Sequence, residues 1–375
     1  MISTVDELLG GLDPDAWDRL AGSSFYSTAA WLKFCADHGG PRRGAIVSHA
    51  DGQPAAAVPV AMVTDQLPPP LYRWNDLLAE RGLPTLASNG LLVGPLQGYR
   101  TQLLTAPGVD GIDAARGLIH ALRDRGDAAC VATYVPTEDA RSLVAAGVSA
   151  PPVLLDTDAW IELPPGGWEA WLDALPKKRR TSVRRERRAF EEAGYTVTHL
   201  PLADCHERLA PLAAATQAKY GHDAPEAFWG GLLQLHVADM GAAARVSVCW
   251  HGDDPVGFCL YYVWGDTLYL RWAGFAYERL AGAAEYFNLV YYDQVMQAPT
   301  LGVRWIHAGI KASEAKALRG AELRPLWLVD LAADSVLATR RDDVRDHTLR
   351  TVEGLLADNR TRAAVRDPDS WLAFT

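Results

Sequence analysis

The sequence predicts a mixed α/β protein, of the α/β or α+β class, with two domains of similar size. A chain of 375 residues exceeds what one ordinary hydrophobic core encloses. A strand–turn–strand pattern occurs twice, in residues 45–62 and again in residues 244–265. A proline follows each turn, at Pro54 and Pro255, and the two patterns lie about half a chain apart. A repeat of this period indicates a duplicated fold.

Helix and strand patterns alternate around both hairpins. In the N-terminal half, residues 111–125 have an amphipathic helix pattern and residues 129–135 a buried strand pattern. Each domain is therefore expected to hold a mixed, mostly antiparallel sheet flanked by helices. In the C-terminal half we expect helices at residues 176–193, 203–219, 225–238, 281–297 and 313–319, and strands at residues 195–200, 266–275, 303–309 and 323–331.

The composition is that of a folded protein and excludes several classes. No apolar run reaches the length of a membrane span, and the N-terminus lacks a signal-peptide pattern. The five cysteines are scattered without CxxC spacing, which favours reduced thiols in the cytoplasm over disulfides or a zinc site. The net charge of −10 argues against DNA binding and against nonspecific nucleic-acid binding by the whole surface. No metal-ligand spacing, dinucleotide fingerprint or Ser-His-Asp signature is present, so no metal is expected.

A phosphate-binding loop is predicted between the strand at residues 266–275 and the helix that follows it. Arg279, Gly282, Ala283 and Ala284 fit the pattern Arg-x-x-Gly-x-Ala. Small residues let backbone N–H groups approach a phosphate at a helix N-terminus, and the arginine would add charge-assisted hydrogen bonds. The alternative interpretation is an alanine-rich helix start beside a solvated arginine.

A strongly basic helix precedes these elements. The segment KKRRTSVRRERRAF, residues 177–190, has eight cationic side chains and one acidic side chain in its first twelve positions. Basic charge at a helix N-terminus opposes the helix dipole, and a bound anion would relieve this, which makes Lys178 and Arg179 candidate ligands. The segment is either a solvated basic face or a binding face for the phosphates of tRNA, a nucleotide-linked acceptor or CoA.

Polar side chains in an apolar context are densest in WIHAGIKASEAKALRGAEL, residues 305–323. His307 lies on a predicted strand and has a natural pKa suited to a general base, although a strand histidine is often only a core residue. Lys316 and Arg319 follow, and either could stabilise an oxyanion or bind a phosphate. Tyr220, near a helix end, and Tyr261 and Arg271, on facing strands, complete the candidate substrate-binding residues.

Three segments resemble Fem-type peptidyltransferases and related GNAT-like proteins. LPKKRRTSVRRERRAFEEAGYTV is similar to the family's basic helix, and DPVGFCLYYVWGDTLYLRWAG to its hairpin and following strand. IHAGIKASEAKALRG resembles the closing strand with its Lys-x-x-x-Gly motif, so that Lys316 and Gly320 align with the family's lysine and glycine. Ala315 and Arg319 replace aromatic residues there, and His307 stands where the family usually has an acid.

The resemblance implies two tandem GNAT (acyl-CoA N-acyltransferase-like) domains. The expected N-terminal GNAT-like domain spans residues 1–160, the C-terminal domain with the active cleft residues 161–331, and a helical tail residues 332–375. Amide-bond formation is implied, from an activated acyl donor to a small-molecule amine acceptor. We predict Lys316 and His307 as catalytic residues.

The donor is either acyl-CoA, held at Arg279–Ala284, or aminoacyl-tRNA, bound through the basic helix at residues 177–188. The acidic net charge and the order of the loop within the chain slightly favour acyl-CoA. A duplicated fold that binds a ligand without turning it over is the second alternative.

Overall fold

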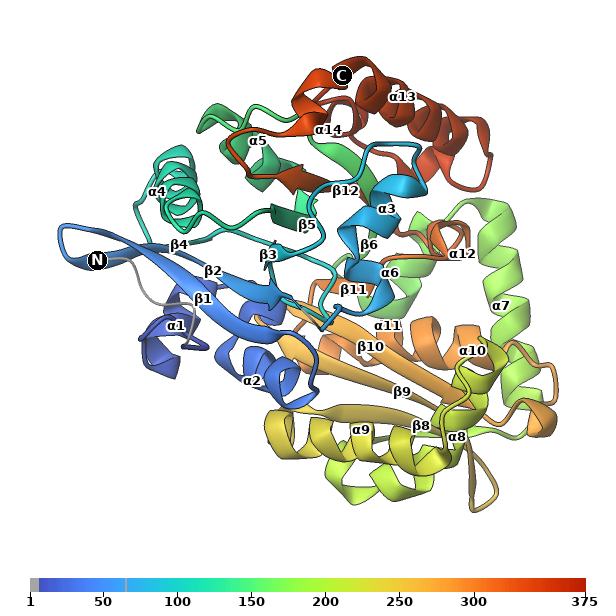
Figure 1. The fold of residues 1–375 in the computed structure, drawn as a ribbon. Helices are drawn as coiled ribbons and strands as arrows, with labels where there is room; N and C mark the ends of the chain where they lie inside the picture. The colour runs from blue at the N-terminus through green and yellow to red at the C-terminus, as the bar shows by residue number, and fades with distance from the viewer. Residues whose placement is uncertain (1–6, 65) are drawn as a thin grey trace. The chain divides into compact units, whose positions relative to one another are not determined.

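The computed structural model describes residues 7–64 and 66–375, which fold as two compact units. Unit 1 comprises the chain up to Asp158 together with Leu323–Thr375, and unit 2 comprises Ala159–Glu322. Both contain strands and helices, so the predicted mixed α/β class is confirmed (Figure 1). No helix among the described residues combines the length and the apolar character that a membrane crossing requires.

Unit 1 is built on a mixed sheet. β1 pairs antiparallel with β2 and β2 with β3, whereas β3 and β5 are parallel and joined through α4. β12 pairs antiparallel with β5, so the chain returns to unit 1 near its C-terminal end. The strands are β1 (Arg42–Ala50), β2 (Gln53–Val63), β3 (Gly90–Val93), β4 (Leu104–Thr105), β5 (Cys130–Pro136), β6 (Val153–Glu162) and β12 (Glu322–Asp330). The helices are α1 (Pro14–Ala21), α2 (Ala29–Asp37), α3 (Trp74–Ala79), α4 (Gly111–Arg123), α5 (Thr137–Ala145), α13 (Arg341–Ala357) and α14 (Pro368–Trp371).

Unit 2 contains a sheet in the order β6, β11, β10, β9, β8, β7, to which β6 contributes its last residues, from Ala159 onward. β10 and β11 are parallel, and the other pairs are antiparallel. Its remaining strands are β7 (Thr196–Pro201), β8 (Arg245–His251), β9 (Asp254–Trp264), β10 (Thr267–Phe275) and β11 (Trp305–Gly309). Its helices are α6 (Gly167–Ala174), α7 (Lys177–Glu192), α8 (His206–Lys219), α9 (Glu226–Met240), α10 (Glu285–Phe287), α11 (Asp293–Leu301) and α12 (Ser313–Ala317).

The two units repeat one pattern of strand pairing. In each, a hairpin is followed by a third antiparallel strand, a helical crossover and a parallel strand: β1–β2–β3–β5 in unit 1 and β8–β9–β10–β11 in unit 2. The first hairpin turns at Asp51 and Gly52, both with left-handed φ, as a tight hairpin turn requires. The duplication predicted from the two hairpins is therefore present in the topology.

The helix expected at residues 281–297 begins later, at Glu285. Gly282 and Ala284 have φ of 76° and 59°, and these left-handed conformations keep the preceding residues out of the helix. A π-helical turn, Asn288–Tyr292, joins α10 to α11. Such turns widen a helix locally and often occur at functional sites.

Candidate functional site

The parallel strands β10 and β11 of unit 2 are paired along only part of their length. β10 pairs with β11 at only three positions, from Thr267 with Trp305 to Tyr269 with His307. β10 continues to Phe275, and its other edge remains paired with β9 except at a bulge at Arg271. Beyond Tyr269, no described residue of β11 is in register with β10. Backbone groups along this edge are thus positioned to bond an extended ligand.

His307 stands at the point where the two strands separate. Its ring centroid lies 4.7 Å from that of Trp160 on β6 and 5.3 Å from that of Tyr269 on β10. The imidazole is 1% exposed. His307, the predicted general base, is therefore buried between the aromatic rings of Trp160 and Tyr269.

A second histidine, His236, lies on the face of the sheet that carries His307 and Tyr269. Tyr262 is the register partner of Tyr269, and its hydroxyl lies 2.6 Å from Nδ1 of His236 on α9. Burial raises the pKa of the Tyr262 phenol, which keeps it protonated. Trp272 packs beside His236, with ring centroids 6.5 Å apart. Sequence reasoning missed His236, although it occupies the buried stripe of α9 between Leu233 and Met240.

Of the two other β9–β10 residues predicted to bind substrate, one joins this face and one does not. Arg271 lies at a bulge in β10, and its charge acts on the Tyr262 phenol. Tyr261 points to the opposite face, where its hydroxyl donates to Oε1 of Gln297 on α11 over 3.1 Å. Successive side chains of a strand alternate between faces, so Tyr261 and Tyr262 cannot both line one cleft.

Lys316 is buried, with 5% exposure, and is held by the chain itself. Its Nζ donates to the carbonyl oxygens of Gly309 and Ile310 over 2.8 and 2.7 Å. The two carbonyl groups belong to the turn at residues 309–312. This turn is unusual, because Gly309, Lys311 and Ala312 all have left-handed φ. The lysine therefore fixes the end of β11, two residues beyond His307.

Arg319 is also buried and belongs to a second polar cluster. Its guanidinium lies 3.3 Å from the ring centroid of Phe287 and 3.7 Å from a carboxylate oxygen of Glu186 on α7. Glu186 also accepts a hydrogen bond from the Tyr292 hydroxyl. Sequence reasoning missed Glu186, although it is the single acidic residue in the first twelve positions of the basic segment. The cluster joins α7 to the helix that follows the predicted phosphate loop.

The predicted phosphate loop already contains charge partners. Arg279 donates to Asp254 at 2.8 Å on the surface. The N–H of Ala281 donates to the Tyr195 hydroxyl at 2.9 Å, and that hydroxyl donates to Glu285 at 3.0 Å. Glu285 is 4% exposed at the first position of α10, so its carboxylate faces the positive end of the helix. A pyrophosphate bound here would meet this negative charge.

The family model that matches this unit is described as an acetyltransferase (GNAT) domain and covers residues 177–317. This protein carries a GNAT acyltransferase domain. The match begins at α7 and ends at α12, so it includes every site residue predicted above except Arg319. The predicted GNAT domain is thereby confirmed for residues 177–317, and with it the prediction of an acyltransferase. Comparison with curated proteins gives no significant match.

Two solved structures resemble the whole chain at low identity. FemX is 11% identical, with a TM-score of 0.57 over 86% of this chain and 96% of its own. L-PGS from Bacillus licheniformis is 14% identical, with a TM-score of 0.57 over 91% of this chain and 98% of its own. These likenesses establish that the fold of both units is shared.

The basic helix α7 of the GNAT domain presents a row of cations to solvent. Two of its arginines are paired, Arg180 with Asp173 and Arg187 with Glu191. Arg179 is half-buried. The described residues supply no ion-pair partner for the exposed cations, which are Lys177, Lys178, Arg184, Arg185 and Arg188. Tyr220 is two-thirds exposed at the end of α8.

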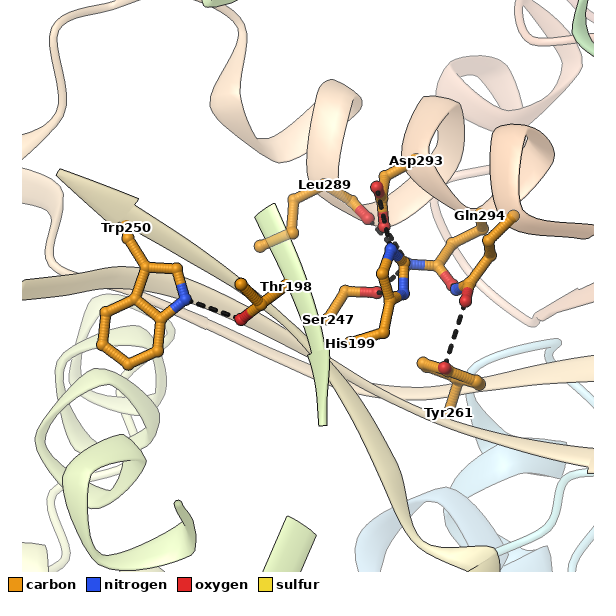
Figure 2. Close-up of polar contacts among 9 residues, drawn as sticks. Thr198, His199, Ser247, Trp250, Tyr261, Leu289, Asp293 and Gln294 are labelled. Carbon is orange, nitrogen blue, oxygen red and sulfur yellow. Dashed lines mark hydrogen bonds and ion pairs between the residues drawn. The ribbon is translucent and has the colours of Figure 1, made fainter. Parts of the chain in front are cut away.

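A polar network that is buried except at His199 lies on the α11 face of the GNAT domain (Figure 2). His199 of β7 lies 3.3 Å from the Ser247 hydroxyl and 3.5 Å from the Asp293 carboxylate. Gln294 donates to Ser247 and to the carbonyl of Leu289, both over 2.9 Å. Ser247, His199 and Asp293 resemble a nucleophile with its base, but they lie on the α11 face of the sheet, opposite to His307, and the Ser247 hydroxyl already accepts a hydrogen bond from Gln294. The network instead fastens β7 and β8 to α11.

Proposed function

We propose that this acyltransferase is an N-acyltransferase, which moves an acyl group from an activated donor to a primary amine. The separation of β10 and β11 after Tyr269 and His307 carries the proposal. It leaves an edge of backbone donors and acceptors that an extended donor arm could join, next to the aromatic face around His307. GNAT domains require both an acyl-donor groove and an adjoining acceptor surface.

The reaction would proceed by direct attack. The amine nitrogen adds to the carbonyl carbon of a thioester or an aminoacyl ester, and the carbon–sulfur or carbon–oxygen bond breaks as the amide forms. The amine loses one proton, for which His307 is the proposed acceptor, and the leaving thiolate or hydroxyl oxygen gains one. Lys316 would act by holding the Gly309–Ala312 turn beside His307 and by placing a positive charge near the reacting carbonyl.

Charges around the domain favour aminoacyl-tRNA over acyl-CoA as the donor. Glu285 opposes a pyrophosphate at the Arg279–Ala284 loop, and Arg279 is already paired with Asp254. The exposed cations of α7, in contrast, are available to the phosphates of a nucleic acid. α7 is also joined to the helix after the loop through the Asn288 side chain, which donates to the backbone carbonyl of Glu186.

Binding measurements with the full chain separate the two donors. We expect charged tRNA to bind with an affinity that falls steeply between 50 and 200 mM salt, and CoA to bind weakly or not at all. Saturable CoA binding with little salt dependence, together with no tRNA binding, would assign acyl-CoA as the donor. Absence of both would favour the non-catalytic binding protein.

A further inference from the structure

Three tyrosines with exposed or half-buried rings lie where β10 ends in the GNAT domain. Tyr220, directly after α8, is 67% exposed, and Tyr286, on α10, is 41% exposed. Tyr277, two residues after β10, is half-buried. No described residue stacks on Tyr220 or forms a hydrogen bond with its hydroxyl. A contiguous group of exposed rings is typical of a binding surface, and we call these three residues the tyrosine surface.

Contacts through the end of β10 hold the tyrosine surface together. The ring centroid of Phe275 lies 6.2 Å from that of Tyr277 and 5.8 Å from that of Tyr286. Lys219, the neighbour of Tyr220, places its ammonium group 3.7 Å from the centroid of the Tyr277 ring. Burial raises the pKa of Tyr286, and the nearby Tyr220 hydroxyl adds to the increase. The three tyrosines therefore form one group, although they come from three separate segments.

The tyrosine surface lies at one end of the open edge of β10. This edge begins beyond Tyr269, and Phe275 lies six residues further along, which is about 20 Å in an extended strand. The open edge ends there, because the backbone N–H of Phe275 donates to the Thr216 hydroxyl of α8 over 2.8 Å. An extended ligand that follows the edge away from His307 therefore meets the tyrosine surface where it leaves the strand.

The chemistry of the tyrosine surface suits the unpaired bases of a nucleic acid. Aromatic side chains stack on any base, and proteins commonly hold single strands in this way. Lys219 is exposed and has no ion-pair partner among the described residues, so its ammonium is available to one phosphate. Asp223 and Glu278 are exposed in the same segments and oppose a row of phosphates, but they do not repel an uncharged base. Stacking therefore dominates binding here, in contrast to the cationic face of α7.

We infer that the tyrosine surface stacks the unpaired nucleotides at the 3′ end of the aminoacyl-tRNA donor. This inference rests on the proposed donor and assigns its single-stranded end to a separate surface. The 3′ end of a charged tRNA carries the aminoacyl ester and is single-stranded, so its bases are free to stack. The exposed cations of α7 bind phosphates, the tyrosine surface binds bases, and the ester follows the β10 edge to His307.

Two tRNAs and two variants of Tyr220 test this inference by fluorescence anisotropy with the full chain. One tRNA is intact, and the other lacks its unpaired 3′ nucleotides. Tyr220→Leu removes the stacking ring and should weaken binding of intact tRNA about tenfold, whereas the matched control Tyr220→Phe keeps the ring and should bind like the wild type. The shortened tRNA should bind the wild type and Tyr220→Leu equally. Neither variant changes a charge, so the salt dependence should stay that of the wild type.

The possible failures of this test are distinguishable. Wild-type affinity of Tyr220→Leu for intact tRNA would overturn the inference, and so would an equal loss with the shortened tRNA or a similar loss in Tyr220→Phe. In these cases the donor assignment stands, provided that the wild-type affinity falls steeply with salt. Absence of tRNA binding by the wild type at every salt concentration would instead refute the donor and the stacking surface together. Because Tyr220 is two-thirds exposed, the melting temperatures of both variants should match that of the wild type.

Discussion

Neutralising two exposed arginines of α7 gives the sharpest test of the donor. Arg184→Gln/Arg185→Gln removes two of the five exposed cations on this helix. Neither arginine has an ion-pair partner among the described residues, and glutamine is a good helix former, so α7 should persist. The change therefore alters charge and little else.

The magnitude follows from counterion release. Each phosphate neutralised contributes a slope of about −0.9 to the dependence of log affinity on log salt, so five contacts give about −4.5 and three give about −2.7. Between 50 and 200 mM salt the wild type should lose about 500-fold in affinity for charged tRNA, and the variant about 40-fold. Fluorescence anisotropy with labelled tRNA at four salt concentrations measures both slopes.

A matched variant separates a specific face from overall charge. Arg304→Gln/Arg345→Gln removes two exposed arginines outside α7 and should leave the wild-type slope unchanged. If both double variants lower the slope equally, tRNA would be responding to net charge alone. A wild-type slope near zero would refute the assignment of α7 as a phosphate-binding face.

Three further predictions concern the site and the stability of the fold. Lys316→Met should lower activity and destabilise unit 2 by about 2 kcal/mol, because two buried carbonyl groups lose their donor. The control is Lys311→Asn, which changes an exposed lysine of the same turn to a residue that tolerates its left-handed φ. Thermal melts and rates of both variants show whether activity falls by more than the loss of stability explains. His307→Asn should lower turnover by about a hundredfold or more, while unchanged turnover would exclude the ring as the proton acceptor. Burial raises the pKa of Asp139 to about 6, so its ionisation costs stability as the pH rises from 4 through 6. Asp139→Asn should therefore be more stable than the wild type by about 2–3 kcal/mol at pH 8 and no more stable at pH 4, by denaturant unfolding at both pH values.

The local features of the fold could be predicted from the sequence because each has a local cause. The Asp51-Gly52 turn, the alternating strands around it and the start of α7 after Pro176 all follow from backbone preferences within a few residues. The helix after β10 was expected four residues too early, because alanine favours helix, whereas the left-handed φ of Gly282 and Ala284 delays its start.

The arrangement of the candidate site depends on which strands are neighbours. The pairing of Tyr262 with Tyr269, and of Tyr269 with His307, brings His236 and His307 to one face, and no local pattern specifies that register. Whether Tyr261 or Tyr262 lies on the same face of the sheet as His307 depends on a shift of one residue. The hydrogen-bond partners of Glu285 and Lys316 could not be predicted either. Glu285 accepts from a tyrosine distant in sequence, and Lys316 donates to two backbone carbonyl groups.

Transfer itself is the most direct test of the central claim. The full chain would be incubated with radiolabelled aminoacyl-tRNA, or with labelled acyl-CoA, and a panel of primary amines, and the products would be treated with alkaline hydroxylamine, which cleaves esters and thioesters but spares amides. The account predicts enzyme-dependent label in a hydroxylamine-stable product, reduced in His307→Asn. Label that remains on both donors across the whole panel, with donor binding intact, would contradict it.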